Sequence, residues 1–208
     1  ILMSMPEIGG DATKLPAVTA RALMTGMTTD TNNFKNSVFP STLEMASSLL
    51  AAGVDRDEII SRLYQSGREN SVRLWGYMLY ENLKITSDGV AYMILNAETA
   101  RKFDLKEGET EGLVNEPLKI DNVRMSIFLK EDGDGFYRVS IRTKKGVSAV
   151  KCSASYFHGG GHENASGGRL FFKPVDGRPA DISAPEEAEK YIIDKTNIYF
   201  ADGSYESR

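Results

Sequence analysis

The sequence predicts an α/β protein with a helical first part and a smaller α+β second part. Apolar residues recur at helical spacing as far as Leu83. From Gly89 onward, short runs rich in β-branched and aromatic residues alternate with turn signals. The change of pattern marks a boundary between two domains. We expect a first domain over residues 1–78, a linker over 79–88 and a second domain over 89–208.

Three helices are expected in the first domain. The first has Pro16 in a first-turn position and ends near Gly26. The second begins at Ser41 as N-cap, with a glutamate three residues on as its capping-box partner, and it ends before Gly53. Asp55 caps the third helix in the same way.

The linker is expected to be helical, because SVRLWGYMLYENL has a long apolar period. The second domain then alternates short strands and helices. VRMSIFLKE and FYRVSIRT, joined by DGDG, form a hairpin. Strands are also expected at residues 89–95 and 168–172, and helices at 148–157 and 185–194.

Composition excludes several classes of protein. The chain has 208 residues, of which 41% are hydrophobic and 26% charged, the range of ordinary globular proteins. Its net charge of −4 gives no general attraction to long polyanions, so any phosphate must be held locally. No apolar run approaches the roughly 20 residues that span a bilayer. The only cysteine, Cys152, is expected to be a small core residue and fits a reducing compartment, so we expect a cytoplasmic location.

The densest unusual feature is HGGGHENASGG, His158–Gly168, which holds five glycines and both histidines of the chain. Glycines let backbone N–H groups approach an anion closely, and His162 adds a donor that can carry charge. Asn164 and Ser166 add further donors, and HENAS is expected to begin a helical turn whose N-terminus favours negative charge. We favour a phosphate-binding loop over the alternative that Gly159 caps a helix and the other glycines only make a turn.

Two side chains elsewhere are candidates to act with this loop. Arg142 ends a predicted strand, where an inward guanidinium would grip a phosphate in a bidentate manner. Asp30 lies in the polar stretch GMTTDTNNF and offers the hard oxygen ligand that Mg²⁺ or Mn²⁺ prefers. Each also has an ordinary interpretation, Arg142 as a solvated surface charge and Asp30 as a turn residue.

Two of these stretches resemble a known family. GMTTDTNNF is similar to the fourth metal-site motif of DHH-family phosphoesterases, usually G-I-x-T-D-T-G-x-F. GGGHENASGG is similar to the G-G-G-H-x-x-A-[AS]-G signature of the DHH-associated C-terminal domain. EGLVN and SIRT, where the family often has an R-S pair, fit in order and spacing. The resemblance covers nearly the whole chain and points to the bacterial nanoRNase and pAp-phosphatase group, which is exopolyphosphatase-related.

The resemblance implies a fold and a function. Residues 1–78 would be the helical C-terminal remnant of a parallel-sheet DHH domain, followed by a linker helix and an α+β domain with a mixed sheet. The protein would use two Mn²⁺ ions, or Mg²⁺, to hydrolyse short oligoribonucleotides and 3′-phosphoadenosine 5′-phosphate (pAp). Asp30 would be a metal ligand and thus catalytic. The substrate phosphate or terminal nucleotide would be held by Gly159, Gly160, Gly161, His162, Arg142 and Thr143.

The chain departs from the family pattern at two points. Asn32 stands where the family usually has glycine, and asparagine still tolerates a left-handed backbone. The DHH tripeptide and its upstream aspartates are absent, and the chain opens on Ile1 with an apolar run already under way. We therefore expect that preceding residues, with most of the metal ligands, are missing and that the 208-residue chain is inactive by itself.

Other functions stay open at this stage. Cyclic-dinucleotide phosphodiesterase and exopolyphosphatase activities occur in the same family, and a non-catalytic nucleotide-binding module is an alternative from a different class. A third alternative is a structural domain in which the glycines only make turns. The expected partner is short RNA or a small nucleotide, no membrane partner is expected, and a homodimer is compatible with the sequence.

Overall fold

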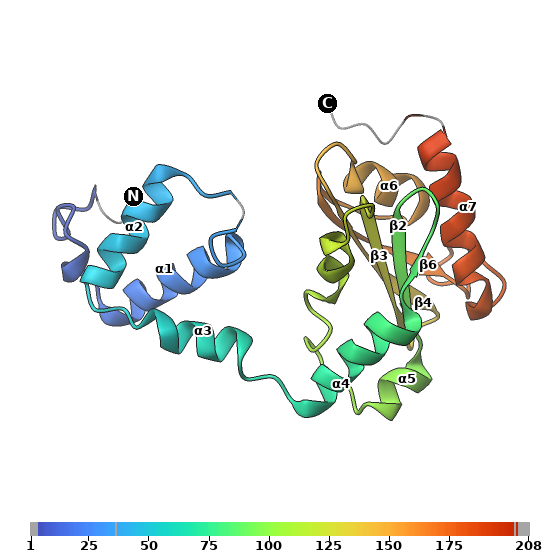
Figure 1. Ribbon diagram of the computed structural model, residues 1–208, viewed down its shortest axis with the longest axis horizontal. Coiled ribbons are helices and arrows are strands. Elements are labelled where there is room, and N and C mark those ends of the chain that lie inside the picture. The colour runs from blue at the N-terminus through green and yellow to red at the C-terminus, as the bar shows by residue number, and fades with distance from the viewer. Residues whose placement is uncertain (1–3, 36, 202, 204–208) are drawn as a thin grey trace. The chain divides into compact units, whose positions relative to one another are not determined.

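The computed structural model describes residues 4–35, 37–201 and 203, and the chain divides into two compact units, residues 1–67 and 68–208 (Figure 1). The first unit is helical. The second is built on a six-stranded sheet with helices packed against it. The prediction of an α/β protein whose second part holds a mixed sheet is confirmed.

The first unit packs its helices around a small apolar core. Met24 and Leu49 are fully buried in it, and Ile59 is nearly so. Asp55 caps the third helix as predicted, since its carboxylate accepts the Glu58 N–H at 2.9 Å. The elements are η2 (Ala12–Lys14), α1 (Ala17–Asp30), α2 (Pro40–Ala51) and α3 (Arg56–Tyr64).

The sequence predicted that helix α1 ends near Gly26, but the helix continues to Asp30. The hydroxyl groups of Thr25 and Thr28 donate to carbonyl oxygens four residues earlier, at 2.9 and 2.8 Å, so these threonines sit inside the helical hydrogen-bond pattern. One glycine is tolerated within a helix at a cost of about 1 kcal/mol. Asp30 is therefore the last residue of a helix and not part of a polar loop.

Helix α2 begins two residues earlier than expected. Pro40 occupies its first turn, where the fixed φ of proline suits a helix, and Phe39 rather than Ser41 is the N-cap. The Thr42 hydroxyl accepts the Phe39 N–H at 3.2 Å and so takes the role expected of the glutamate. The expected end of this helix is confirmed, because Gly53 adopts φ 86° just beyond it.

The second unit holds one sheet in the strand order β1-β2-β3-β4-β6-β5. Strands β2 and β3 are parallel and every other neighbouring pair is antiparallel, which makes the sheet mixed. The predicted hairpin is present as β3 and β4. The strands are β1 (Lys84–Ile85), β2 (Val90–Leu95), β3 (Met125–Asp132), β4 (Phe136–Thr143), β5 (Gly160–His162) and β6 (Ala165–Phe171).

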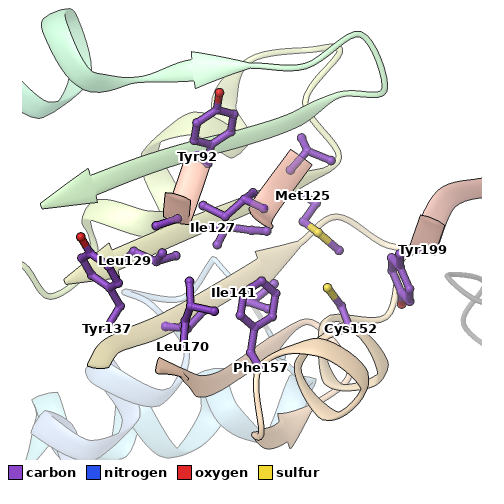
Figure 2. Close-up of a cluster of buried hydrophobic side chains, with 14 of the residues drawn as sticks. Tyr92, Met125, Ile127, Leu129, Tyr137, Ile141, Cys152, Phe157, Leu170 and Tyr199 are labelled. Carbon is purple, nitrogen blue, oxygen red and sulfur yellow. The ribbon is translucent and has the colours of Figure 1, made fainter. Parts of the chain in front are cut away.

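One face of the sheet forms the main core against α6 (Ala149–Tyr156) and α7 (Ala188–Ala201), which follows the short turn η5 (Pro185–Glu187). Ile127, Ile141 and Leu170, from three neighbouring strands, lie in one buried cluster with Cys152 of α6 (Figure 2). Cys152 is fully buried, as expected of a core residue, and burial raises the pKa of its thiol to about 12. The thiol is therefore protonated at neutral pH and unreactive.

The other face of the sheet is covered over β2, β3 and part of β4. Leu74 and Met78 pack there against Phe128 of β3. The elements on this side are α4 (Glu69–Tyr77), the π-helical turn η3 (Met78–Asn82), α5 (Ala97–Lys102) and η4 (Leu113–Lys119).

The predicted linker helix therefore belongs to the second unit. The structure divides the chain between Gly67 and Arg68 rather than within residues 79–88. The apolar period of this helix, interpreted from the sequence as a connection, is its buried face, with Leu74 and Met78 fully buried.

This packing predicts how two substitutions on α4 differ. Leu74→Ala should lower the free energy of unfolding of the second unit by about 2–4 kcal/mol, because it leaves a cavity against the sheet. Val72, two residues away, is 67% exposed, so Val72→Ala should change it by less than about 0.5 kcal/mol. Urea denaturation of both variants measures the difference. Equal stabilities would contradict the assignment of α4 to the second unit.

Candidate functional site

The glycine-histidine stretch forms an edge strand and its turn. Gly160–His162 is strand β5, which pairs with β6 at the edge of the sheet. Residues 163–164 form a two-residue turn between the strands, so the prediction of a helical turn in HENAS is wrong. An edge strand leaves one row of backbone N–H and C=O groups without sheet partners. Such a row supplies the backbone donors that the sequence suggested, in an extended rather than a looped form.

Internal packing explains two of the three consecutive glycines. A Cβ on Gly159 would collide with the Gly167 carbonyl oxygen and the Ser153 hydroxyl. Gly161 has φ 145°, and its Cβ would lie 2.7 Å from the Ala165 carbonyl oxygen. Gly160 is different, because it is exposed and a Cβ there would meet no atom within 4 Å. Only Gly160 leaves room for a ligand to approach the strand.

His162 and Arg142 lie on the same face of the sheet. His162 is opposite Ala165 of β6, and Ala165 is opposite Arg142 of β4. Directly opposite residues point to the same side, and neighbouring strands are about 4.8 Å apart, so the two backbones are about 10 Å apart. Gly160 belongs to the same face, one row further along, opposite Gly167. The structure thus brings together three of the predicted residues on the open sheet face, which is the face of β4, β6 and β5 that no α-helix covers.

Arg142 is half-buried and has no salt bridge with a described residue. Its Nη1 donates to the Ile141 and Ser166 carbonyl oxygens at 2.9 and 3.4 Å. Burial lowers the pKa of its guanidinium, and the negative charge of Glu111 opposes that shift. A guanidinium remains charged in proteins, so the partial loss of water leaves a cation that an anionic ligand would stabilise.

Ser126 extends the same row and was missed by the sequence analysis. It lies opposite Arg142 on β3, is fully buried, and its hydroxyl has no hydrogen-bond partner among the described residues. Leaving such a group unpaired costs about 1–3 kcal/mol. The only sequence signal is a single serine inside the apolar run MSIFL.

Thr143 does not join this group, contrary to the prediction. It lies one residue beyond Arg142 and so points to the opposite, core-facing side of the sheet. Its hydroxyl is buried, donates to the Val147 carbonyl oxygen at 2.7 Å and accepts from the Asn164 amide at 3.0 Å. The Ser166 hydroxyl is buried as well and donates to the Ala149 carbonyl oxygen. These polar groups hold the hairpin against α6 and are not available to a ligand.

His158 has a structural position. Helix α6 ends at Tyr156, within one residue of the predicted end, and His158 lies beyond the C-cap with φ 48°. Its Nε2 lies 2.8 Å from Asp181 Oδ1, and Asp181 Oδ2 accepts the Phe171 N–H at 2.9 Å. This bridge ties the end of α6 to the segment after β6, and the His158 ring also packs against Phe171, with the ring centroids 5.6 Å apart.

Asp30 lies in the first unit, exposed at the end of α1. The turn after it is held firmly: Asn32, Asn33 and Phe34 all have positive φ. Arg56 fixes this turn by donating to Asn33 Oδ1 at 2.6 Å. The left-handed backbone expected at Asn32 is confirmed.

The described residues do not form a metal site by themselves. Among them, no three histidine, cysteine, aspartate or glutamate side chains gather closely enough to hold an ion. Asp30 therefore belongs to no such group, and Mn²⁺ needs several oxygen or nitrogen ligands. Within the part of the chain that the structure describes, no helix is both long and apolar enough to cross a membrane.

The space around Gly159 and around Gly160 predicts different effects of a methyl group on stability. Gly159→Ala should lower the free energy of unfolding by more than about 2 kcal/mol, because α6 and β6 must separate to admit the methyl group. Gly160→Ala should change it by less than about 0.5 kcal/mol. Guanidinium denaturation tests both. A strongly destabilised Gly160→Ala variant would show that Gly160 has a packing role instead.

Comparisons with known proteins place these features in a family. Residues 87–171 match the DHHA1 domain. A probable bifunctional oligoribonuclease and PAP phosphatase NrnA from Streptococcus mutans is 35% identical over 162 residues, 76% of this chain and 50% of the relative. The bifunctional oligoribonuclease and PAP phosphatase NrnA of Bacillus subtilis is 29% identical over the same share of this chain and 49% of its own length.

One solved structure is also similar to this chain in fold and sequence. The crystal structure of an exopolyphosphatase-related protein from Bacteroides fragilis has a TM-score of 0.81 and 33% identity, and the match covers 95% of this chain and 54% of that one. The chain spans about half the length of the curated relatives it matches. The strand with Arg142 and the glycine-histidine hairpin thus lie in the part of the chain, residues 87–171, that matches the DHHA1 domain.

Proposed function

We propose that the protein is a Mn²⁺-dependent phosphoesterase that hydrolyses short oligoribonucleotides and pAp, and that the open sheet face of its second unit holds the substrate phosphate. The observation that carries this proposal is Arg142, a half-buried cation without a salt bridge to a described residue, in one row with His162. The names of the two curated relatives support the choice of substrates.

The residues on this face have distinct roles in the proposal. Arg142 binds the phosphate through charged hydrogen bonds, and its strand fixes the direction of the guanidinium. Gly160 admits the phosphate to the backbone of the edge strand, since no side chain blocks it. His162 contacts the same anion from the other side of Ala165. Together these groups position a terminal phosphate, and positioning is a major part of catalysis of phosphoryl transfer.

The proposal for the whole protein goes further than these groups. Asp30 would be one ligand of the Mn²⁺ site, and the full-length protein would supply the others. Residues 1–78 would be part of the metal-binding DHH domain, the 208 residues alone would be inactive, and the protein would act in the cytoplasm. Asp30 is the one described residue that the proposal assigns to this site, and the other residues of this chain that have a role in the proposal bind substrate.

Substrate binding is tested with two variants of the full-length protein. Arg142→Gln and Gly160→Ala should each raise the KM for pAp about tenfold or more, because the first removes a charged hydrogen bond and the second obstructs the phosphate. Arg73→Gln and Gly133→Ala are matched controls, since Arg73 is exposed on α4 and a Cβ on Gly133 meets nothing within 4 Å. An unchanged KM in both test variants would contradict the proposed binding face.

The role of Asp30 is tested separately. Asp30→Asn in the full-length protein should lower kcat for pAp with Mn²⁺ at least about 100-fold, because a neutral amide binds the metal weakly. The KM should change little, since Asp30 is not assigned to phosphate binding. Asp57, exposed on α3, gives the matched control Asp57→Asn. Wild-type turnover in Asp30→Asn would show that Asp30 is not a metal ligand.

A further inference from the structure

The open sheet face carries a second group of cations beyond Arg142. Arg138 of β4 lies directly opposite Arg169 of β6. Like charges in directly opposite positions destabilise a sheet. The pair therefore needs an explanation outside the stability of the fold, and departures of this kind are expected at functional sites.

Only one of the two charges has a salt bridge with a described residue, although the charge of Asp132 also interacts with that of Arg169 at longer range. Arg138 Nε donates to Asp132 Oδ2 at 2.7 Å, and its side chain is 69% exposed, which leaves the terminal nitrogens open to solvent. Arg169 has no salt bridge with a described residue. Its guanidinium lies over the Phe136 ring, 5.1 Å from the centroid. Both guanidinium groups are thus held in place while keeping donors available.

The pair borders a groove of about 840 Å³ at the far end of the same face. Phe136 and Phe171 line it together with residues of the segment after β6, among them Arg178. Asp134 and Asp176 also border the groove, so its lining carries three positively charged and two negatively charged side chains. The lining residues are Asp134, Phe136, Arg138, Arg169, Phe171, Pro174, Val175, Asp176 and Arg178.

Small residues connect this groove with the Arg142 site. Between the Arg142 row and the Arg138 row lies a row formed by Ser140, Gly167 and Gly160. Four residues of strand separate Arg142 from Arg138, which is about 13 Å. An extended ligand can therefore lie along β4 and β6 with a cationic group at each end and no large side chain between them.

We propose that the Arg138–Arg169 pair binds the sugar-phosphate backbone of the further nucleotides of a single-stranded oligoribonucleotide whose terminal phosphate lies at Arg142. This inference rests on the proposed function. The open face then binds several nucleotides of one substrate, and longer substrates make a contact that pAp cannot make.

The contact is with phosphate rather than with bases. Phe136 and Phe171 are only 7% and 3% exposed, so neither offers a ring face for a base to stack on. Arginine donors at a fixed spacing recognise the backbone independently of sequence. The contact with the Arg138–Arg169 pair therefore depends on the length of the substrate and not on the identity of its bases.

The test compares a diadenylate with a pentaadenylate, each labelled with fluorescein, bound to the full-length protein in EDTA so that neither is cleaved. The readout is the ratio of the two affinities by fluorescence anisotropy. In Arg169→Gln the advantage of the pentaadenylate should fall about tenfold, the effect of removing one charged hydrogen bond. Its plot of log Kd against log salt should become shallower by about 0.7 for each phosphate that the variant no longer binds.

Two further variants complete the design. Arg169→Lys keeps the charge and should retain most of the salt dependence, which a merely misfolded variant would not do. Arg73→Gln removes the same charge from the exposed face of α4 and should leave the ratio unchanged.

An unchanged ratio in Arg169→Gln, with both RNAs bound by the wild-type protein, would overturn the inference alone. If the wild-type protein bound neither RNA nor pAp, the proposed function would fail and the inference would fail with it.

Discussion

The close contact between helix α6 and strand β6 is the constraint on which the candidate site depends. Gly159 and Gly168 allow it, because a Cβ on either would collide with the backbone across the contact. The Ser153 hydroxyl then donates to the Gly167 carbonyl oxygen at 2.6 Å, and the Arg169 N–H donates to the Phe157 carbonyl oxygen. The chain can therefore pass from the helix directly into the edge strand, and this short passage places His162 on the open face.

The same contact separates two kinds of polar residue that are neighbours in sequence. Side chains that point toward α6, such as Thr143 and Ser166, are buried and form hydrogen bonds that hold the hairpin. Those that point away, such as Arg142 and His162, lie where no α-helix covers the sheet. Since strand residues alternate between faces, a shift of one position would exchange the two sets. The residues that hold the hairpin and the residues proposed to bind substrate thus lie on opposite sides of one sheet.

The hairpin of β3 and β4 and the α+β character of the second part could be predicted from the sequence, because turn residues and alternating strands are local signals. The sequence did not show where the helix through Gly26 ends or to which unit α4 belongs, since both depend on packing between distant residues. The difference between Gly159 and Gly160 could not be predicted either, because it lies in the space around each glycine. Arg138 and Arg169 are 31 positions apart in sequence, and only the strand register brings them together.

The central claim is that the open face of the second unit binds a nucleotide phosphate, and an NMR titration of the ¹⁵N-labelled 208-residue chain with pAp tests it directly. We predict that the largest shifts occur at the Gly160, His162 and Gly167 amides and at the Arg142 side-chain Nε–H. The amide resonances of Thr143, whose side chain faces the core, and of Gly89 should shift much less. Shifts confined to other surfaces, or no shifts at millimolar pAp, would contradict the account.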